Sequence, residues 1–346
     1  MPRKPALRPF ERVWQTASAG AAVIAATLLS AAPSLAGDCQ SPLAACFDAD
    51  QLWIPAAPTP FAALPSARTG GGRLTAGATV GYLSRPVVLS APSPNPDGTE
   101  IPVVDDRLAA AVLITSTPIA RLQLSLVVPA VLSQSGAGIE SVTTRGGAAL
   151  ESTAIGDPRL GAGFVLLETE AGARQPALAL MVRYELSLPL GGEQTFAGER
   201  SVVAAPSVAA EVSDGAWFAG AEIGARLKQP VQLGDARFGT QLSSALGVGV
   251  RPLPDLLSFT AEAFVRPVLV SQPRPEAELD LVPAEWLLAA HSSPIDRLGL
   301  SLAVGGAIPL TSATRLVPGG TERQYYAGLA TPEWRTFLVA RVRVLD

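Results

Sequence analysis

Hydrophobic residues alternate with small ones between Leu298 and Leu310, and this alternation constrains the fold more than any other feature of the sequence. Every second residue is Leu, Val or Ile, with Gly306 as the one interruption, and Gly, Ser or Ala lie between them as far as Ala307. A period of two is typical of a β-strand, because successive side chains point to opposite faces. A strand facing water would carry charged residues on its second face, but here that face is small and neutral.

The same alternation recurs along most of the chain. It is clear over residues 74–82, 122–132, 178–190 and 217–228, and it is weaker around residues 285–293. These and similar runs predict about twelve strands, many of them about ten residues long, whereas strands of soluble proteins average about half that length. The sequence therefore predicts an all-β fold, an antiparallel transmembrane β-barrel of about twelve strands over residues 73–346.

A soluble β-sandwich is the alternative, since its strands alternate too. Its outer face should be charged, but Lys228 is the only lysine after the first 36 residues. The predicted connections also alternate between short ones, such as residues 117–121, and long ones, such as residues 134–156 and 311–326. Outer-membrane barrels have short periplasmic turns and long extracellular loops, so the barrel is favoured.

The first 36 residues predict a secretory signal. A basic start precedes an apolar stretch at residues 19–29, and cleavage is expected between Ala36 and Gly37. A transmembrane anchor is the alternative, but the apolar stretch is short for a span. A lipid on Cys39 is a further alternative, which Asp38 disfavours because the residue before a lipidated cysteine should be small. Export predicts residence in the outer membrane of a Gram-negative bacterium, with both termini periplasmic.

Residues 37–72 are rich in Pro and Ala and lack periodicity. They predict an irregular periplasmic segment, either a short plug or a tether. Cys39 and Cys46 are the only cysteines, and in an oxidising compartment they favour a disulfide, with two free thiols as the alternative. Two Cys and one His are a poor ligand set, so neither a metal nor another cofactor is expected.

Charged residues fall on the face that becomes the barrel lumen. The candidate lumen-lining residues are Arg183, Glu185, Glu211, Glu222, Arg226, Glu262, Arg266, Arg341 and Arg343. Charges cost less there than on the lipid face, because the lumen holds water or ionic partners. They predict a porin-like lining that tunes the passage of small solutes, or internal salt bridges that close the lumen. The expected partners are outer-membrane lipid and small solutes, and the net charge of −4 gives no basis for nucleic-acid binding.

The single histidine, His291, bears on whether such a barrel could be an enzyme. A hydrolase would need a histidine grouped with a nucleophile and an orienting side chain. His291 falls beside the predicted short turn at residues 293–297, away from the extracellular rim where such groups are expected. It is interpreted most simply as an interfacial residue, and the protein as a non-enzyme.

Several stretches resemble a group of outer-membrane β-barrels found in myxobacteria and related Gram-negative bacteria, often labelled OmpA-family or transporter-like. They are residues 153–161, 186–191 and 196–198, together with the repeated small–Leu strands. The resemblance covers residues 73–345 and implies a barrel type more than an activity. Members of the group often carry a peptidoglycan-binding domain after the barrel. Because this sequence ends at Asp346, the resemblance implies no anchoring by such a domain.

Overall fold

The protein is described from a computed structural model. The described residues are 45–69, 73–91, 99–139, 149–172, 175–192, 195–199, 201–233, 236–253, 256–269, 279–280, 282–292, 298–310, 312–313, 326–327 and 331–345. The chain divides into two units, Met1–Gly37 and Asp38–Asp346, and every described residue belongs to the second. The predicted signal, its cleavage site at Ala36 and Gly37, and Cys39 lie outside the described residues. Within the described ranges, no helix is long and apolar enough to span a bilayer.

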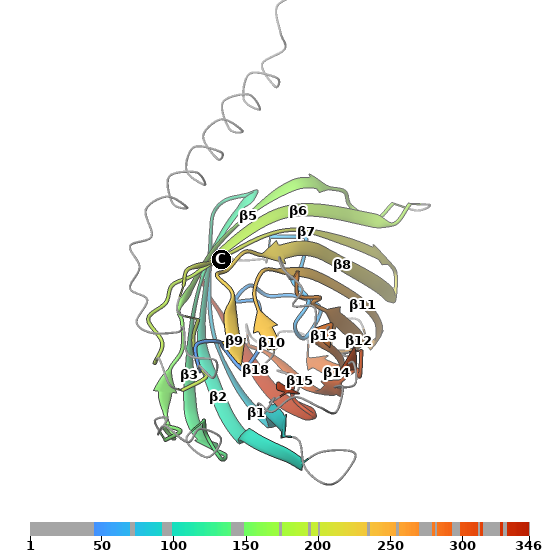
Figure 1. The fold of residues 1–346 in the computed structure, drawn as a ribbon. Helices are drawn as coiled ribbons and strands as arrows, with labels where there is room; N and C mark the ends of the chain where they lie inside the picture. The colour runs from blue at the N-terminus through green and yellow to red at the C-terminus, as the bar shows by residue number, and fades with distance from the viewer. Residues whose placement is uncertain are drawn as a thin grey trace, which may run out of the picture. The chain divides into compact units, whose positions relative to one another are not determined.

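Twelve antiparallel strands close into a barrel, which confirms the predicted fold (Figure 1). Each strand of the ring pairs with the next one along the chain, and the first also pairs with the last. The ring strands are β1 (Leu74–Ala91), β2 (Thr99–Ile119), β3 (Leu122–Ser135), β5 (Arg159–Glu168), β6 (Ala177–Ser187), β7 (Val203–Asp214), β8 (Trp217–Arg226), β11 (Gln241–Leu253), β12 (Leu257–Val265), β14 (Ala284–Ser292), β15 (Leu298–Ala307) and β18 (Trp334–Leu345).

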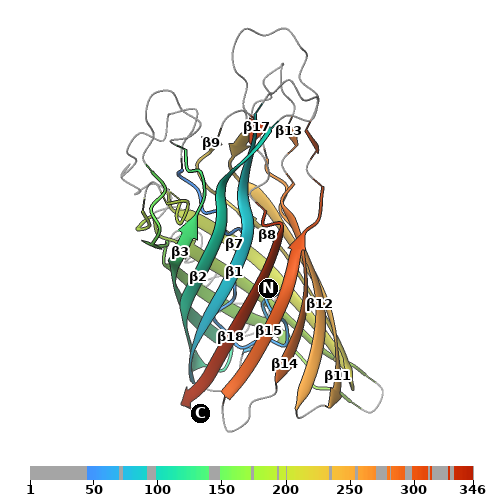
Figure 2. The ribbon, with the colours of Figure 1, turned by 90° about the horizontal axis from the view of Figure 1, so that it is seen from below.

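Among the described residues, six short strands lie outside this ring. β4 (Ala154–Ile155) pairs with β3, and β17 (Tyr326–Ala327) pairs with β1. Two further pairs are β9 (Val231–Leu233) with β10 (Ala236–Phe238), and β13 (Leu279–Asp280) with β16 (Ser312–Ala313). All six belong to connections at one end of the barrel, and Figure 2 shows β9, β13 and β17 at the end opposite the C-terminus.

The alternation of β15 becomes an exposed face and a buried face. Leu298, Leu300 and Leu302 are exposed on the outside, whereas Ser301 and Ala303 are buried. Exposed leucines in a row suit contact with lipid tails, and small residues leave room inside a narrow lumen. The alternating sequence continues to Leu310, but the strand itself ends at Ala307.

Candidate functional site: a segment inside the lumen

Residues 45–69, which we call the inner segment, run along the inside of the barrel. Near its start, Asp48 lies 3.6 Å from Nη1 of Arg107, in the first half of β2. Near its end, the hydroxyl of Thr69 donates to the carbonyl of Ala120, which follows the last residue of β2, at 3.2 Å. The inner segment therefore spans the lumen from the end with long connections to the end with short turns. Figure 1, viewed along the barrel, shows it in blue within the ring of strands.

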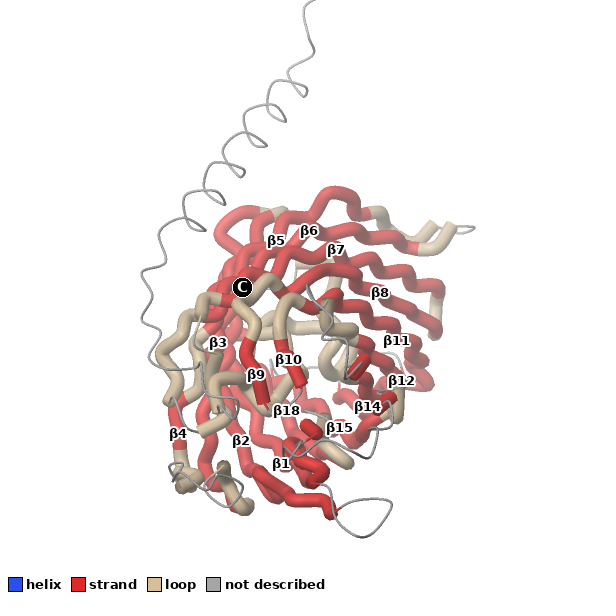
Figure 3. The backbone as a smooth tube through the Cα atoms, in the orientation of Figure 1, coloured by secondary structure: helices blue, strands red, loops and turns tan. Residues whose placement is uncertain are grey.

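The inner segment contains neither helix nor strand, and Figure 3 shows it as a loop. It is the described part of the segment at residues 37–72, which the sequence predicts to be irregular and periplasmic. Its described residues lie inside the lumen, enclosed by the barrel wall, which is the position of a plug rather than of an external tether. Cys46 is disulfide-bonded, and its candidate partner Cys39 lies outside the described residues.

Glu262 of β12 holds the middle of the inner segment. The backbone N–H groups of Ala62, Ala63 and Leu64 donate to its carboxylate at 2.5, 3.0 and 2.8 Å. The hydroxyl of Thr260 donates to the same carboxylate at 3.1 Å. The Glu262 side chain is buried, so these charge-assisted bonds replace the water that the carboxylate loses.

Glu211 of β7 holds the end of the inner segment in the same way. Its carboxylate accepts from the Ser66 hydroxyl at 2.7 Å, the Ala67 N–H at 3.4 Å and Nε of Arg68 at 3.3 Å. Arg68 also reaches Glu168, near the short turns, at 3.1 Å. The sequence predicts Glu211 and Glu262 as lumen residues, and the structure adds what they bind.

Arginines of the wall hold the first half of the inner segment. Nη1 of Arg335 lies 3.0 Å from the carboxylate of Asp50. Three other guanidinium groups donate to backbone carbonyls of the segment: Arg226 to Gln51 at 2.8 Å, Arg159 to Ile54 at 3.3 Å, and Arg341 to Pro55 at 2.8 Å.

Trp53 contacts two of these arginines. The guanidinium carbon of Arg226 lies 4.0 Å from the centroid of the Trp53 ring, and that of Arg159 lies 4.8 Å from it. Both distances are within the range of a cation–π contact. Trp53 is therefore the aromatic centre of a cationic cluster in the lumen.

Asp157 supports the wall behind this cluster. Its carboxylate accepts the backbone N–H groups of Leu190, Gly191 and Glu199 at 3.1, 2.7 and 2.6 Å. Burial raises the pKa of Asp157 to about 6, although these hydrogen bonds favour its ionised form. A Cβ atom at Gly198 would lie 2.5 Å from Oδ1 of Asp157, so the contact requires glycine there. The stretches at residues 153–161, 186–191 and 196–198 thus meet in space.

The loop held by Asp157 also contacts the inner segment. The N–H of Ala49 donates to the carbonyl of Phe196 at 2.9 Å, and Nη1 of Arg107 donates to the same oxygen at 2.9 Å. The rings of Phe47 and Phe196 pack edge to face with centroids 5.3 Å apart. The three stretches therefore form part of the seat of the inner segment.

The nine predicted lumen residues lie in or next to ring strands, and all are buried or half-buried. Some make the predicted ion pairs: Arg183 lies 2.7 Å from Glu185 and 3.4 Å from Glu222, and Arg266 lies 3.9 Å from Glu285. Arg343 is half-buried near the end of β18. The four that bind the inner segment are Glu211, Arg226, Glu262 and Arg341.

The structure corrects the interpretation of His291 as an interfacial residue. His291 is 5% exposed and faces the lumen side of β14, where Nδ1 lies 2.8 Å from the Ser301 hydroxyl and Nε2 lies 3.0 Å from that of Thr260. The alternation of β14 explains this, because Trp286 and Leu288 face outward and odd-numbered residues face inward.

Other functional residues were missed by the sequence analysis. Arg107, Arg159 and Arg335 line the lumen but were not among the candidates, although each lies in an alternating strand and its parity could have revealed it. Trp53 had no such signal, since it lies in a segment without periodicity. Within the described residues, no group of three His, Cys, Asp or Glu could hold a metal ion.

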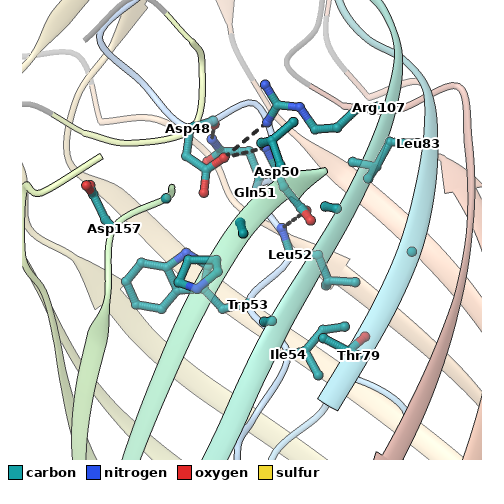
Figure 4. Close-up of a pocket in the computed structure, with 18 of the residues that line it drawn as sticks. Asp48, Asp50, Gln51, Leu52, Trp53, Ile54, Thr79, Leu83, Arg107 and Asp157 are labelled. Atoms are coloured by element: carbon teal, nitrogen blue, oxygen red, sulfur yellow. Dashed lines mark hydrogen bonds and ion pairs between the residues drawn. The ribbon is translucent and has the colours of Figure 1, made fainter. Parts of the chain in front are cut away.

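Two cavities lie beside the inner segment. The larger, of about 90 Å³, is lined by Asp48 and residues 50–54 of the segment and by the wall from β18 through β1 to β8. The smaller, of about 50 Å³, lies against Pro55, Arg183 and Phe264. Trp53 lines both cavities. Figure 4 shows Asp48 turned toward Arg107, with Trp53 and Asp157 at another side of the larger cavity.

Several solved structures are similar to this barrel. The chain is similar to an outer-membrane channel of Pseudomonas putida F1, with a TM-score of 0.52 and 13% identity, over 82% of this chain and 98% of that one. It is also similar to the porin NanC (TM-score 0.42, 7% identity, 78% and 100% coverage) and to the P. putida toluene transporter TodX (0.41, 11%, 80% and 91%). No protein-family model and no curated protein matches. At these identities the likeness shows the barrel fold alone.

Proposed function

We propose that this protein is a narrow outer-membrane channel or transporter for small solutes, and not an enzyme. The observation that carries the proposal is the way the lumen is occupied. The inner segment joins the wall through hydrogen bonds and ion pairs, and it leaves two cavities that share Trp53. Water and small polar solutes can replace such contacts one at a time. We therefore propose that solutes pass through the two cavities, beside Trp53.

The proposal also covers where the protein resides and which group of barrels it belongs to. We infer residence in a Gram-negative outer membrane, after removal of a signal peptide, with the short turns and both termini periplasmic and the exposed leucines in contact with lipid. The resemblance to the myxobacterial barrel group is part of this inference. It rests on the stretches that carry the resemblance, two of which meet where the Gly191 N–H donates to Asp157.

A structural barrel with a closed lumen is the second candidate. It is favoured by the second half of the inner segment, where Phe61 and Leu64 are buried against Phe218 and Phe264 of the wall. The rings of Phe61 and Phe218 lie 5.3 Å apart. Apolar packing of this kind resists displacement more than hydrogen bonds that water can replace.

Conductance in planar bilayers separates the two candidates. The mature chain is refolded and compared with Trp53→Ala, which removes the ring that lines both cavities, and with Trp217→Ala as a control, because Trp217 is 66% exposed on the outside. The channel proposal expects current steps from the wild type, larger steps from Trp53→Ala, and wild-type steps from Trp217→Ala. Folded barrels that carry no current in any of the three would support the closed structural barrel.

A further inference from the structure

Some of the charged side chains that line the larger cavity have no partner of opposite charge among the described residues. Three of its carboxylates have cationic partners: Asp48 with Arg107, Asp50 with Arg335, and Glu199 with Lys228. The fourth, Asp157, is satisfied by three backbone N–H groups. The remaining charged residues of the cavity are Arg159 and Arg226.

Arg159 and Arg226 have no carboxylate within 4.0 Å among the described residues. Each is 7% exposed, and each makes its hydrogen bond to a neutral backbone carbonyl of the inner segment. Nη1 of Arg159 is buried and has no hydrogen-bond partner within the described part of the chain. The nearby carboxylates of Glu185 and Glu222 pair with Arg183 instead.

Two buried guanidinium groups on one ring are costly without an anion. Arg159 and Arg226 both contact Trp53, so their like charges lie close together. A buried guanidinium without an ionic partner leaves its charge and its donors poorly compensated. A guanidinium binds a carboxylate in bidentate geometry, which satisfies both its charge and its donors.

The rest of the cavity wall is suited to an apolar body. The apolar side chains that line it include Leu52, Leu83, Ala111, Pro129, Val131 and Phe337. We propose that the larger cavity binds a small organic carboxylate, with its carboxylate group on Arg159 and Arg226 beside Trp53 and its short apolar body against this wall. This inference rests on the proposed function, because it names the class of solute that would pass.

Binding to the full mature barrel in detergent tests the site. The probe is butyrate, followed by titration calorimetry and by tryptophan fluorescence, to which Trp53 contributes. The neutral analogue 1-butanol has a similar body without the charge, and sulfate is an anion without the body. The wild type should bind butyrate at least about tenfold more tightly than either, given the usual strength of hydrogen bonds to charged groups.

Substitutions assign the binding to the two arginines. Arg159→Gln and Arg226→Gln should each weaken butyrate binding at least about tenfold. Arg121→Gln is the matched control, since Arg121 is exposed in the turn between β2 and β3 and does not line the larger cavity. Heat-modifiable mobility on a gel checks that each variant is folded, and the comparison of probes on the wild type needs no variant.

Several outcomes would overturn the inference: no butyrate binding, equal binding of 1-butanol or sulfate, or equal loss in the Arg121→Gln control. Failure of the inference and failure of the proposed function remain distinguishable. A barrel that binds butyrate but carries no current contradicts the channel alone. A barrel that conducts but does not bind butyrate contradicts the carboxylate site alone.

Discussion

At Glu262 one carboxylate receives three consecutive backbone N–H groups of the inner segment. The Thr260 hydroxyl donates to the same carboxylate and therefore accepts from Nε2 of His291. This arrangement makes Nδ1 of His291 the acceptor for the Ser301 hydroxyl. Hydrogen bonds that run from Ser301 through His291 and Thr260 therefore hold the Glu262 carboxylate in place. The carboxylate in turn holds the inner segment, which has no regular secondary structure.

Replacing Glu262 with Gln should loosen the inner segment. The amide keeps one acceptor oxygen but loses the charge and turns N–H groups toward other donors, so we expect a loss of about 1.5–3 kcal/mol in the free energy of docking the segment. The rate at which proteinase K cleaves residues 59–67 measures this loss. The control is Glu168→Gln, because Glu168 is 40% exposed in its pair with Arg68 and should change little. Equal cleavage of both variants would contradict the role of Glu262.

The strand β15 shows how the position of a lipid-facing residue determines the cost of substituting it. Its outward residues meet lipid, so their cost of substitution depends on depth in the membrane. Leu302 lies in the middle of the strand and is 58% exposed, while Leu310 lies beyond its end and is 47% exposed. The two leucines are similar in exposure but differ in their position along the barrel wall.

The same substitution at these two positions should have different effects. Leu302→Arg should lower the free energy of unfolding by about 2–4 kcal/mol, and Leu310→Arg by about 0–1 kcal/mol, because the cost of a lipid-facing arginine is greatest at the midplane. Urea unfolding in lipid vesicles measures both. Similar losses at the two positions would argue against a membrane around the middle of β15.

The inner segment is an element whose docking should depend on pH. Burial raises the pKa of Asp48 to about 7 from its usual 3.8; the nearby carboxylate of Asp50 adds to this shift and Arg107 opposes it. The docked segment therefore binds more protons than a released one between about pH 4 and pH 7, and docking weakens as pH rises through this range.

Asp48→Asn isolates this effect, because its side chain does not titrate. The rate of proteinase K cleavage in residues 45–55 of the wild type, divided by that of Asp48→Asn at the same pH, should rise severalfold from about pH 5 to about pH 8. The ratio cancels the pH dependence of the protease itself. A constant or falling ratio would show that Asp48 does not couple docking to protons.

At the scale of the whole molecule, closure depends on the pairing of β1 with β18. The register runs from Leu74 opposite Leu345 to Ser84 opposite Trp334. Without this seam, β1 and β18 would each present an unpaired edge to the membrane, where backbone groups find no water. The seam joins the two ends of the barrel sequence, so it forms only when all twelve strands are in place.

Removal of residues 334–346 should therefore prevent folding into a closed barrel. In detergent, the truncated chain should lose the heat-modifiable gel mobility expected of the wild type. A control lacking only residues 345–346 keeps all but the last pair of the seam and should retain it. Retention of the mobility shift by the longer truncation would mean that another pair of strands closes the barrel.

Much of the fold is determined by the sequence alone. A period of two, with lipid on one face and a narrow lumen on the other, allows few alternatives, so the residues from Leu298 to Val304 specify a membrane strand by themselves. The same parity identified Glu211, Glu262 and Arg226 as lumen residues. Parity also places His291 inside the barrel, although its position beside a predicted short turn suggested an interfacial residue.

Only the tertiary structure decided what these residues bind. The inner segment has no periodicity, because it is held by contacts from the wall and not by its own hydrogen-bond pattern. Its partners, such as Glu262 for Ala62 and Arg226 for Gln51, are about two hundred residues away in the sequence. Alternation states which face a side chain is on, but not which segment crosses the lumen beside it. The cluster of Arg159, Arg226 and Trp53 exists only because the barrel closes around that segment.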